Sequence, residues 1–218
     1  MNKSIKCIII DLDGTLIDSG PDLMDALNFV LKKQAVQEIS DQVIGTLVGG
    51  GAKSMIEKAY NHLKLRIPEK KIDFMINDFL DFYFDNCYKK SRLYPNVEKT
   101  LKVLKPLFKL AVCTNKKQHI TNKILEKYNI KQYFDYVLGS GTEFKLKPDI
   151  AMLEHCSEKL AVQTKNCMMV GDSNNDIIPA NILSMKSVYV SYGYGKLIDQ
   201  IIPDFKIDKF DDLIKILI

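Results

Sequence analysis

The stretch IIIDLDGTL at residues 8–16 decides the fold, because a buried apolar run ends there in two acidic side chains. The run at residues 5–10 is rich in β-branched residues and almost continuously apolar, as in a strand that is covered on both faces. Similar short runs recur at residues 107–113, 136–138, 167–170 and 187–190. Segments with helical spacing of apolar residues lie between the later runs. This alternation predicts an α/β fold built on a doubly wound parallel sheet with helices on both faces.

The interval between the first two predicted strands is far longer than a crossover helix requires. Residues 17–93 contain no convincing strand, but apolar residues repeat at helical spacing at residues 23–31 and again at residues 72–84. The second repeat is aromatic, and we interpret it as core packing rather than as a cofactor site. We therefore predict an inserted all-helical domain at 17–93 with its own core. The catalytic core would comprise residues 1–16 and 94–218.

Composition limits the classes of function. The chain has 218 residues, 46% of them hydrophobic, and a formal net charge of +4. Its lysines are spread along the sequence, so nucleic-acid binding is not predicted. The apolar runs are too short to cross a bilayer, and acidic residues interrupt any signal peptide, so we expect a cytoplasmic protein with no membrane contact. Five scattered cysteines and three isolated histidines predict neither a disulfide framework nor a transition-metal site.

Polar side chains follow the predicted strands at the points where those strands end. Ligand crevices of open parallel sheets lie at these carboxyl ends. Each acidic residue there could be an ordinary helix cap, but four acids at one edge would repel one another unless a cation bound them. Carboxylates without histidine or cysteine select a hard ion, and we predict Mg²⁺. The candidate residues are Asp11, Asp13, Thr114, Asn115, Lys116, Lys145, Lys147, Asp172 and Asp176.

Four ordered motifs are similar to those of the haloacid dehalogenase-like phosphatases. They are D-x-D-G-T-L at residues 11–16, the strand-ending Thr114, the pair Lys147-Pro148, and G-D-S-x-x-D at residues 171–176. The resemblance implies a Rossmann-like core, an inserted helical cap, and Mg²⁺-dependent hydrolysis of a small anionic phosphomonoester. Further segments resemble bacterial phosphoglycolate phosphatases, which implies 2-phosphoglycolate as substrate. These segments are LVGGGA at 47–52, TNK at 114–116, SYGYG at 191–195 and IDKFDDL at 207–213.

The same resemblance implies roles for the acidic residues. Asp11 would attack phosphorus and form an aspartyl-phosphate. Asp13 would protonate the leaving oxygen and later accept a proton from the hydrolytic water. Mg²⁺ would be held by one oxygen of Asp11, the backbone carbonyl of Asp13 and the carboxylate of Asp172. Asp176 is expected outside the metal ligands, where it would order Lys147 or metal-bound waters, or else would cap the helix that follows it.

Phosphate binding is assigned to a second group of residues. The Thr114 hydroxyl and the backbone N–H of Asn115 would donate to the phosphoryl oxygens, and Lys147 would supply positive charge. Lys145 is a nearby rival for that last role, although only Lys147 has the proline that follows it in the motif.

The triple glycine of the insert is the candidate substrate loop. Gly49, Gly50 and Gly51 are expected either to form a tight loop whose N–H groups approach a small carboxylate, or to connect two helices without contacting a ligand. Other phosphatases, pyrophosphatases and sugar-phosphate mutases share the catalytic motifs. A phosphorylatable switch module is the alternative outside enzymes, but such modules have neither a large cap nor the second acid. The sequence leaves the oligomeric state open.

Overall fold

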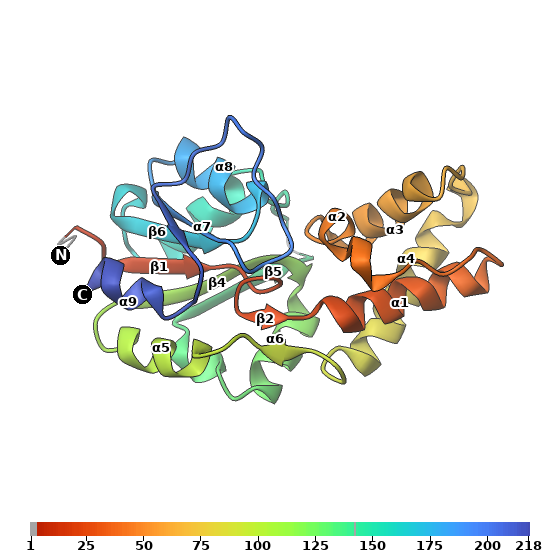
Figure 1. The fold of residues 1–218 in the computed structure, drawn as a ribbon. Coiled ribbons are helices and arrows are strands. Elements are labelled where there is room, and N and C mark those ends of the chain that lie inside the picture. Colours follow the sequence, from red (N-terminus) through yellow and green to blue (C-terminus); the bar gives the residue numbers. More distant parts are fainter. Residues whose placement is uncertain (1–3, 142) are drawn as a thin grey trace.

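The computed structural model describes residues 4–141 and 143–218, and Figure 1 shows a sheet with helices on both sides and a helical lobe next to it. All neighbouring strands of the sheet run parallel, in the order β5-β4-β1-β6-β7-β8. The prediction of a doubly wound parallel sheet is confirmed. The strands are β1 (Cys7–Ile10), β4 (Lys109–Lys117), β5 (Tyr136–Ser140), β6 (Cys167–Gly171), β7 (Lys186–Val190) and β8 (Phe205–Ile207).

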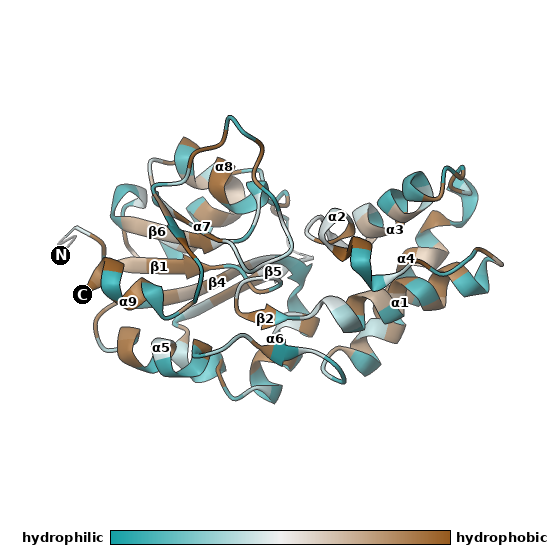
Figure 2. Ribbon diagram, viewed as in Figure 1, coloured by the Kyte–Doolittle hydropathy of each residue, from teal (hydrophilic) through white to brown (hydrophobic). Residues whose placement is uncertain are grey.

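Both faces of the sheet are buried, which explains why its central strands are continuously apolar. Side chains alternate along a strand, so Ile8 and Ile10 of β1 join one apolar cluster, and Cys7 and Ile9 join the other. Helices α5 (Val97–Leu104), α6 (Gln118–Lys127) and α9 (Asp212–Leu217) cover the first face (Figure 1). The second face is covered by α7 (Ala151–Lys159) and α8 (Asn174–Ile182). Much of β1 and β4 is accordingly brown in Figure 2, while teal residues are frequent on the helices.

The lobe next to the sheet is built from the inserted segment. Its helices are α1 (Gly20–Lys33), α2 (Ile44–Leu47), α3 (Gly51–His62) and α4 (Ile72–Asn86). Helices α1 and α4 pack against each other, and the rings of Phe29 and Phe82 stack with centroids 4.4 Å apart. The apolar side chains of the lobe are continuous with the cluster on the first face of the sheet.

Three details differ from the sequence-based prediction. Two short antiparallel strands, β2 (Ile17–Asp18) and β3 (Arg92–Leu93), join the two ends of the insert, where no strand was predicted. Strand β8 was also missed. Finally, β4 continues to Lys117, with an irregular register after Cys113, so Thr114 and its two neighbours lie within the end of the strand rather than after it. Strands β2, β3 and β8 are each too short to show the period on which strand prediction depends, and the continuation of β4 past Cys113 is polar rather than apolar.

Four shorter 3₁₀ turns complete the described structure, at Asp41–Val43, Glu69–Lys71, Lys131–Tyr133 and Thr164–Asn166. In the described part of the chain, no helix combines the length and the apolarity that a bilayer-spanning helix needs.

Candidate active site

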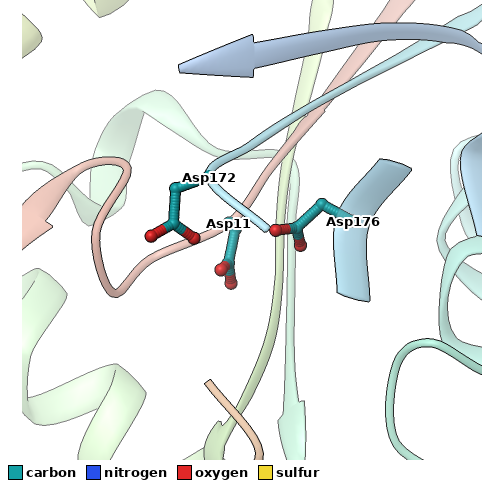
Figure 3. Close-up of side chains that lie close together, drawn as sticks. All are labelled: Asp11, Asp172 and Asp176. Atoms are coloured by element: carbon teal, nitrogen blue, oxygen red, sulfur yellow. The ribbon is translucent and has the colours of Figure 1, made fainter. Parts of the chain in front are cut away.

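Three aspartates from two strand ends meet at the carboxyl edge of the sheet. Asp11 directly follows β1, Asp172 directly follows β6, and Asp176 lies in the first turn of α8. One oxygen of each carboxylate lies within 4.8 Å of an oxygen of the other two, and Figure 3 shows the three carboxylates facing a common space. Asp13 is outside this cluster.

Asp11 is the most strongly perturbed of the acids. Its side chain is buried, and burial raises the pKa of its carboxyl to about 8, with Lys147 opposing and Asp176, Asp172 and Asp13 reinforcing the rise. The Lys147 ammonium lies 3.0 Å from Asp11 Oδ1. That contact lacks hydrogen-bond geometry, so this buried oxygen has no donor in the described structure. A cation bound here would supply the partner that Asp11 Oδ1 lacks.

Asp172 is oriented by two backbone donors. Its Oδ2 accepts from Tyr194 N at 2.7 Å and from Gly195 N at 3.0 Å, whereas Oδ1 accepts no hydrogen bond from the described residues. Burial and the nearby Asp176 raise the pKa of Asp172 to about 7, although those two donors oppose the shift. Gly14 passes close to the same carboxylate, because a Cβ on it would lie 2.2 Å from Asp172 Oδ2, and its φ is +78°. Only glycine fits there without displacing Asp172.

The lysine of the third motif lies between two of these acids. Lys147 Nζ donates to Asp176 Oδ1 and to the carbonyl of Cys113, both at 2.6 Å. Burial alone would lower the pKa of Lys147, but Asp11 and Asp176 outweigh it and raise the pKa. Lys145, its rival in the sequence, is exposed.

Asp176 does two things at once. Its Oδ1 receives the Lys147 ammonium, and its Oδ2 accepts from the backbone N–H and the hydroxyl of Ser173, which closes a capping box at the start of α8. Both of its oxygens are therefore occupied, whereas Asp11 and Asp172 each keep an oxygen that has no hydrogen-bond donor among residues 4–141 and 143–218. If a metal ion is bound, Asp11 and Asp172 are the better ligands.

The second motif connects the sheet to the glycine loop. Thr114 is buried, and the Asn115 side chain donates to the carbonyls of Lys147 at 2.8 Å and Gly49 at 3.2 Å. The same Gly49 carbonyl accepts from Asn175 Nδ2 at 2.8 Å. The glycine loop thus rests on the edge of the sheet that carries the acids, and Gly51 already begins α3.

Three side chains that were assigned no role, those of Lys116, Tyr83 and Ser19, lie around Asp13. Lys116 Nζ lies 2.9 Å from Asp13 Oδ1 and donates to the Tyr83 hydroxyl at 2.7 Å. The Ser19 hydroxyl also donates to the Asp13 carboxylate. Lys116 was among the candidate residues because it follows Thr114 and Asn115 directly, but the sequence assigned it no role. No sequence signal separates Tyr83 from the other aromatic residues of its helix.

A cavity of about 420 Å³ lies between the sheet edge and the helical lobe. It is lined by Asp11, Asp13, Thr114 and the lysines beside them, and also by the triple glycine. Helix α4 contributes apolar residues to the lining, including Ile76, Phe79 and Leu80. The predicted aromatic stripe therefore does pack in the core, but one side of it also lines this space.

Comparison with known proteins places the chain in a family. The family model described as haloacid dehalogenase-like hydrolase matches residues 8–190. The chain belongs to the haloacid dehalogenase-like hydrolases. It is 33% identical to a phosphoglycolate phosphatase of Aquifex aeolicus, over 98% of this chain and 97% of that protein. A phosphoglycolate phosphatase of Psychrobacter arcticus is 36% identical, over 100% of this chain and 97% of that protein.

Solved structures of this hydrolase family have the same fold. The crystal structure of a predicted phosphoglycolate phosphatase from Haemophilus somnus superimposes with a TM-score of 0.91 at 33% identity, covering 99% of both chains. The match over nearly the whole of both chains includes the helical lobe as well as the sheet. The lobe is therefore part of the shared architecture.

Proposed function

We propose that this hydrolase cleaves phosphomonoesters with the help of Mg²⁺ and that its substrate is 2-phosphoglycolate. One observation carries the proposal: Asp11, buried at the end of β1, keeps an oxygen without a donor next to Asp172 and Lys147. A carboxylate in such a place can attack phosphorus only if its charge, and that of the phosphate, are balanced. Relatives at 33% and 36% identity, named phosphoglycolate phosphatase, support the choice of substrate.

The donor set at this edge fits Mg²⁺. It consists of carboxylate oxygens, with no histidine or cysteine in the cluster, and hard cations prefer such ligands. We assign the ion to one oxygen of Asp11, the backbone carbonyl of Asp13 and the free oxygen of Asp172. When bound, the ion supplies positive charge that lets a dianionic phosphate approach an anionic nucleophile.

Asp11 and Asp13 divide the chemistry. An Asp11 oxygen forms a bond to phosphorus as the bond from phosphorus to the leaving oxygen breaks, and Asp13 donates its proton to that oxygen. Asp13 then accepts a proton from water as the water attacks the aspartyl-phosphate, which releases phosphate and restores Asp11. The second acid is necessary because the first is occupied by the phosphoryl group.

The remaining polar groups stabilise the transferred phosphoryl group. The Thr114 hydroxyl and the Asn115 N–H donate to its oxygens, and Lys147 adds positive charge beside Asp11. Asp176 keeps Lys147 in place through their hydrogen bond of 2.6 Å. Because Asn115 also bonds to the Lys147 backbone, the two phosphate-binding segments are held together before a substrate arrives.

We further propose that residues 17–93 act as a cap over a catalytic core formed by 1–16 and 94–218. The loop at Gly49, Gly50 and Gly51 contacts that core through the Gly49 carbonyl. Closure of the cap excludes bulk water while Asp11 is phosphorylated, and it limits the size of the substrate.

The test is phosphate release from a panel of substrates, with Mg²⁺ and with a chelator. The panel contains 2-phosphoglycolate, sugar phosphates, nucleotides and pyrophosphate. We expect the highest kcat/KM with 2-phosphoglycolate and no turnover in chelator. A clear preference for a bulkier phosphate would contradict the substrate assignment, and phosphate binding with no repeated turnover would favour a switch module.

A further inference from the structure

Lys116 is a buried cation that the proposed chemistry does not use. Its side chain is only 4% exposed, although a lysine pays a large desolvation penalty when it leaves water without partners. The two partners of Lys116 come from different parts of the fold. Asp13 belongs to the loop after β1, whereas Tyr83 belongs to α4 in the lobe.

The position of Lys116 relative to Asp13 matches a particular substrate geometry. Under the proposed function, Asp13 lies within about 3 Å of the leaving oxygen when it donates its proton. Lys116 Nζ is 2.9 Å from Asp13 Oδ1, so it lies within about 6 Å of that oxygen. In 2-phosphoglycolate a single methylene joins this oxygen to the carboxylate. With bonds of about 1.5 Å, the carboxylate oxygens lie roughly 3 Å from it, within reach of the ammonium.

Both Lys116 and Tyr83 retain donors for an incoming anion. A lysine ammonium has three N–H groups and no acceptor, so it must be the donor in the bond to the Tyr83 hydroxyl. That leaves the hydroxyl hydrogen of Tyr83 available, and in the described part of the chain it has no acceptor. Burial raises the pKa of Tyr83 well above its ordinary value, which keeps the hydroxyl protonated. A carboxylate has two oxygens and could accept from both groups.

The surroundings strengthen such an interaction. Tyr83 is 1% exposed, and Phe79, Ile76 and Leu80 of the same helix line the adjoining wall. Charge-assisted hydrogen bonds are stronger in a site of this low polarity than in water. Lys53 also lines the cavity, but its side chain is 66% exposed and its ammonium lies 3.9 Å from a Glu57 oxygen. Solvent ions and Glu57 therefore weaken the attraction of Lys53 for a bound anion.

We propose that the Lys116 ammonium and the Tyr83 hydroxyl together bind the carboxylate of the substrate. The inference rests on the proposed function and adds to it the residues that select a phosphate ester carrying a carboxylate on the adjacent carbon. One of them comes from the sheet and the other from the lobe, so a bound carboxylate connects the two. Lys116 is a specificity-determining residue that also neutralises Asp13 when no substrate is present.

The experiment compares two substrates that differ in this one group. Ethyl phosphate has a methyl group where 2-phosphoglycolate has its carboxylate. The kcat/KM of each is measured for the wild type, Tyr83→Phe and Lys116→Met. Tyr60→Phe is the matched control, because Tyr60 is another buried tyrosine of the lobe and does not line the cavity.

The preference is the kcat/KM for 2-phosphoglycolate divided by the kcat/KM for ethyl phosphate. We expect this ratio to fall about 10- to 100-fold in Lys116→Met, which loses a charged hydrogen bond. In Tyr83→Phe, which loses a weaker hydrogen bond, it should fall about 5- to 20-fold. Tyr60→Phe should leave it unchanged. Lys116→Met also disturbs Asp13 and lowers kcat for both substrates, but the ratio removes that common effect.

The outcomes separate this inference from the proposed function. If the wild type does not prefer 2-phosphoglycolate to ethyl phosphate, the proposed substrate is wrong, and this inference fails with it. If the wild type has the preference and both variants retain it, the substrate stands, and the carboxylate is bound elsewhere, with the N–H groups of the glycine loop as the alternative. Should Lys116→Met fail to fold, Tyr83→Phe alone decides.

Discussion

Replacing the proposed nucleophile should make the metal-free protein more stable. In the Asp11→Asn variant, the buried carboxylate becomes a neutral amide of nearly the same shape. Burial raises the pKa of Asp11 from 3.8 to about 8, so the folded protein holds a proton there that the unfolded chain has lost. Between these values, raising the pH lowers the stability of the metal-free wild type, since the folded state binds more protons than the unfolded state. Below pH 4 both states are protonated, and the effect disappears.

The size of this effect follows from the two pKa values. Each pH unit between them corresponds to about 1.4 kcal/mol, which gives an upper bound of about 5 kcal/mol at pH 8. The amide of Asp11→Asn cannot form the ion pair with Lys147, which offsets part of the gain. We expect a net stabilisation of about 2 to 4 kcal/mol at pH 8, or a rise in Tm of about 5 to 15 °C.

The assay is thermal unfolding in chelator at pH 5 and pH 8, for the wild type and for Asp11→Asn. Asp208→Asn is the matched control, since Asp208 lies on the exposed surface away from the cluster. The advantage of Asp11→Asn should be small at pH 5, should widen at pH 8, and should shrink when Mg²⁺ is added. Equal or lower stability of Asp11→Asn at pH 8 would refute the view that uncompensated carboxylates strain this edge. The variant should have no measurable phosphatase activity under any of these conditions.

Three further predictions concern the same cluster. Lys147→Met should lower the free energy of unfolding by about 3 to 5 kcal/mol and abolish turnover, because it leaves two buried acids without their cation. Urea unfolding measures the loss of stability, and an unchanged midpoint would contradict the prediction. Mg²⁺ affinity should rise as the pH is raised from 6 to 8, and binding should release protons, because the pKa values of Asp11 and Asp172 are raised to about 8 and about 7. Calorimetry in buffers of different ionisation enthalpy detects the released protons. A pH-independent affinity would argue against Asp11 and Asp172 as ligands. Gly14→Ala should weaken Mg²⁺ binding at least tenfold and lower the free energy of unfolding by about 1 to 2 kcal/mol, since φ at this position is positive and the new Cβ would meet Asp172. The same calorimetric titration measures the affinity, and an unchanged affinity would contradict the prediction.

The sequence predicted the parts of the fold that have a long or continuous pattern. Strands β1 and β6 are buried on both faces, so their apolar runs are visible without any knowledge of their neighbours. Strand β8 has only three residues and alternates in burial, and β2 and β3 have two residues each. Such segments are stabilised by partners that are distant in the sequence, and no local period reveals them.

The candidate site divides in a similar way. Asp11 and Asp172 were predictable because parallel strands present their carboxyl ends at a single edge. The contact between Lys116 and Tyr83 was not, since it depends on how α4 packs against the sheet rather than on the spacing of either residue. The same holds for Tyr194 and Gly195, whose backbone groups orient Asp172. Side-chain type indicates chemistry, but backbone donors have no signature in a sequence.

The most direct test of the account is to trap the proposed covalent intermediate. The enzyme is mixed with 2-phosphoglycolate and Mg²⁺, quenched within one turnover and treated with borohydride, which reduces an aspartyl-phosphate to homoserine. Peptide mass spectrometry then locates the modified residue. The account predicts reduction at Asp11, with none in the Asp11→Asn variant or without substrate. Reduction at another aspartate, or at none while phosphate is released, would contradict it.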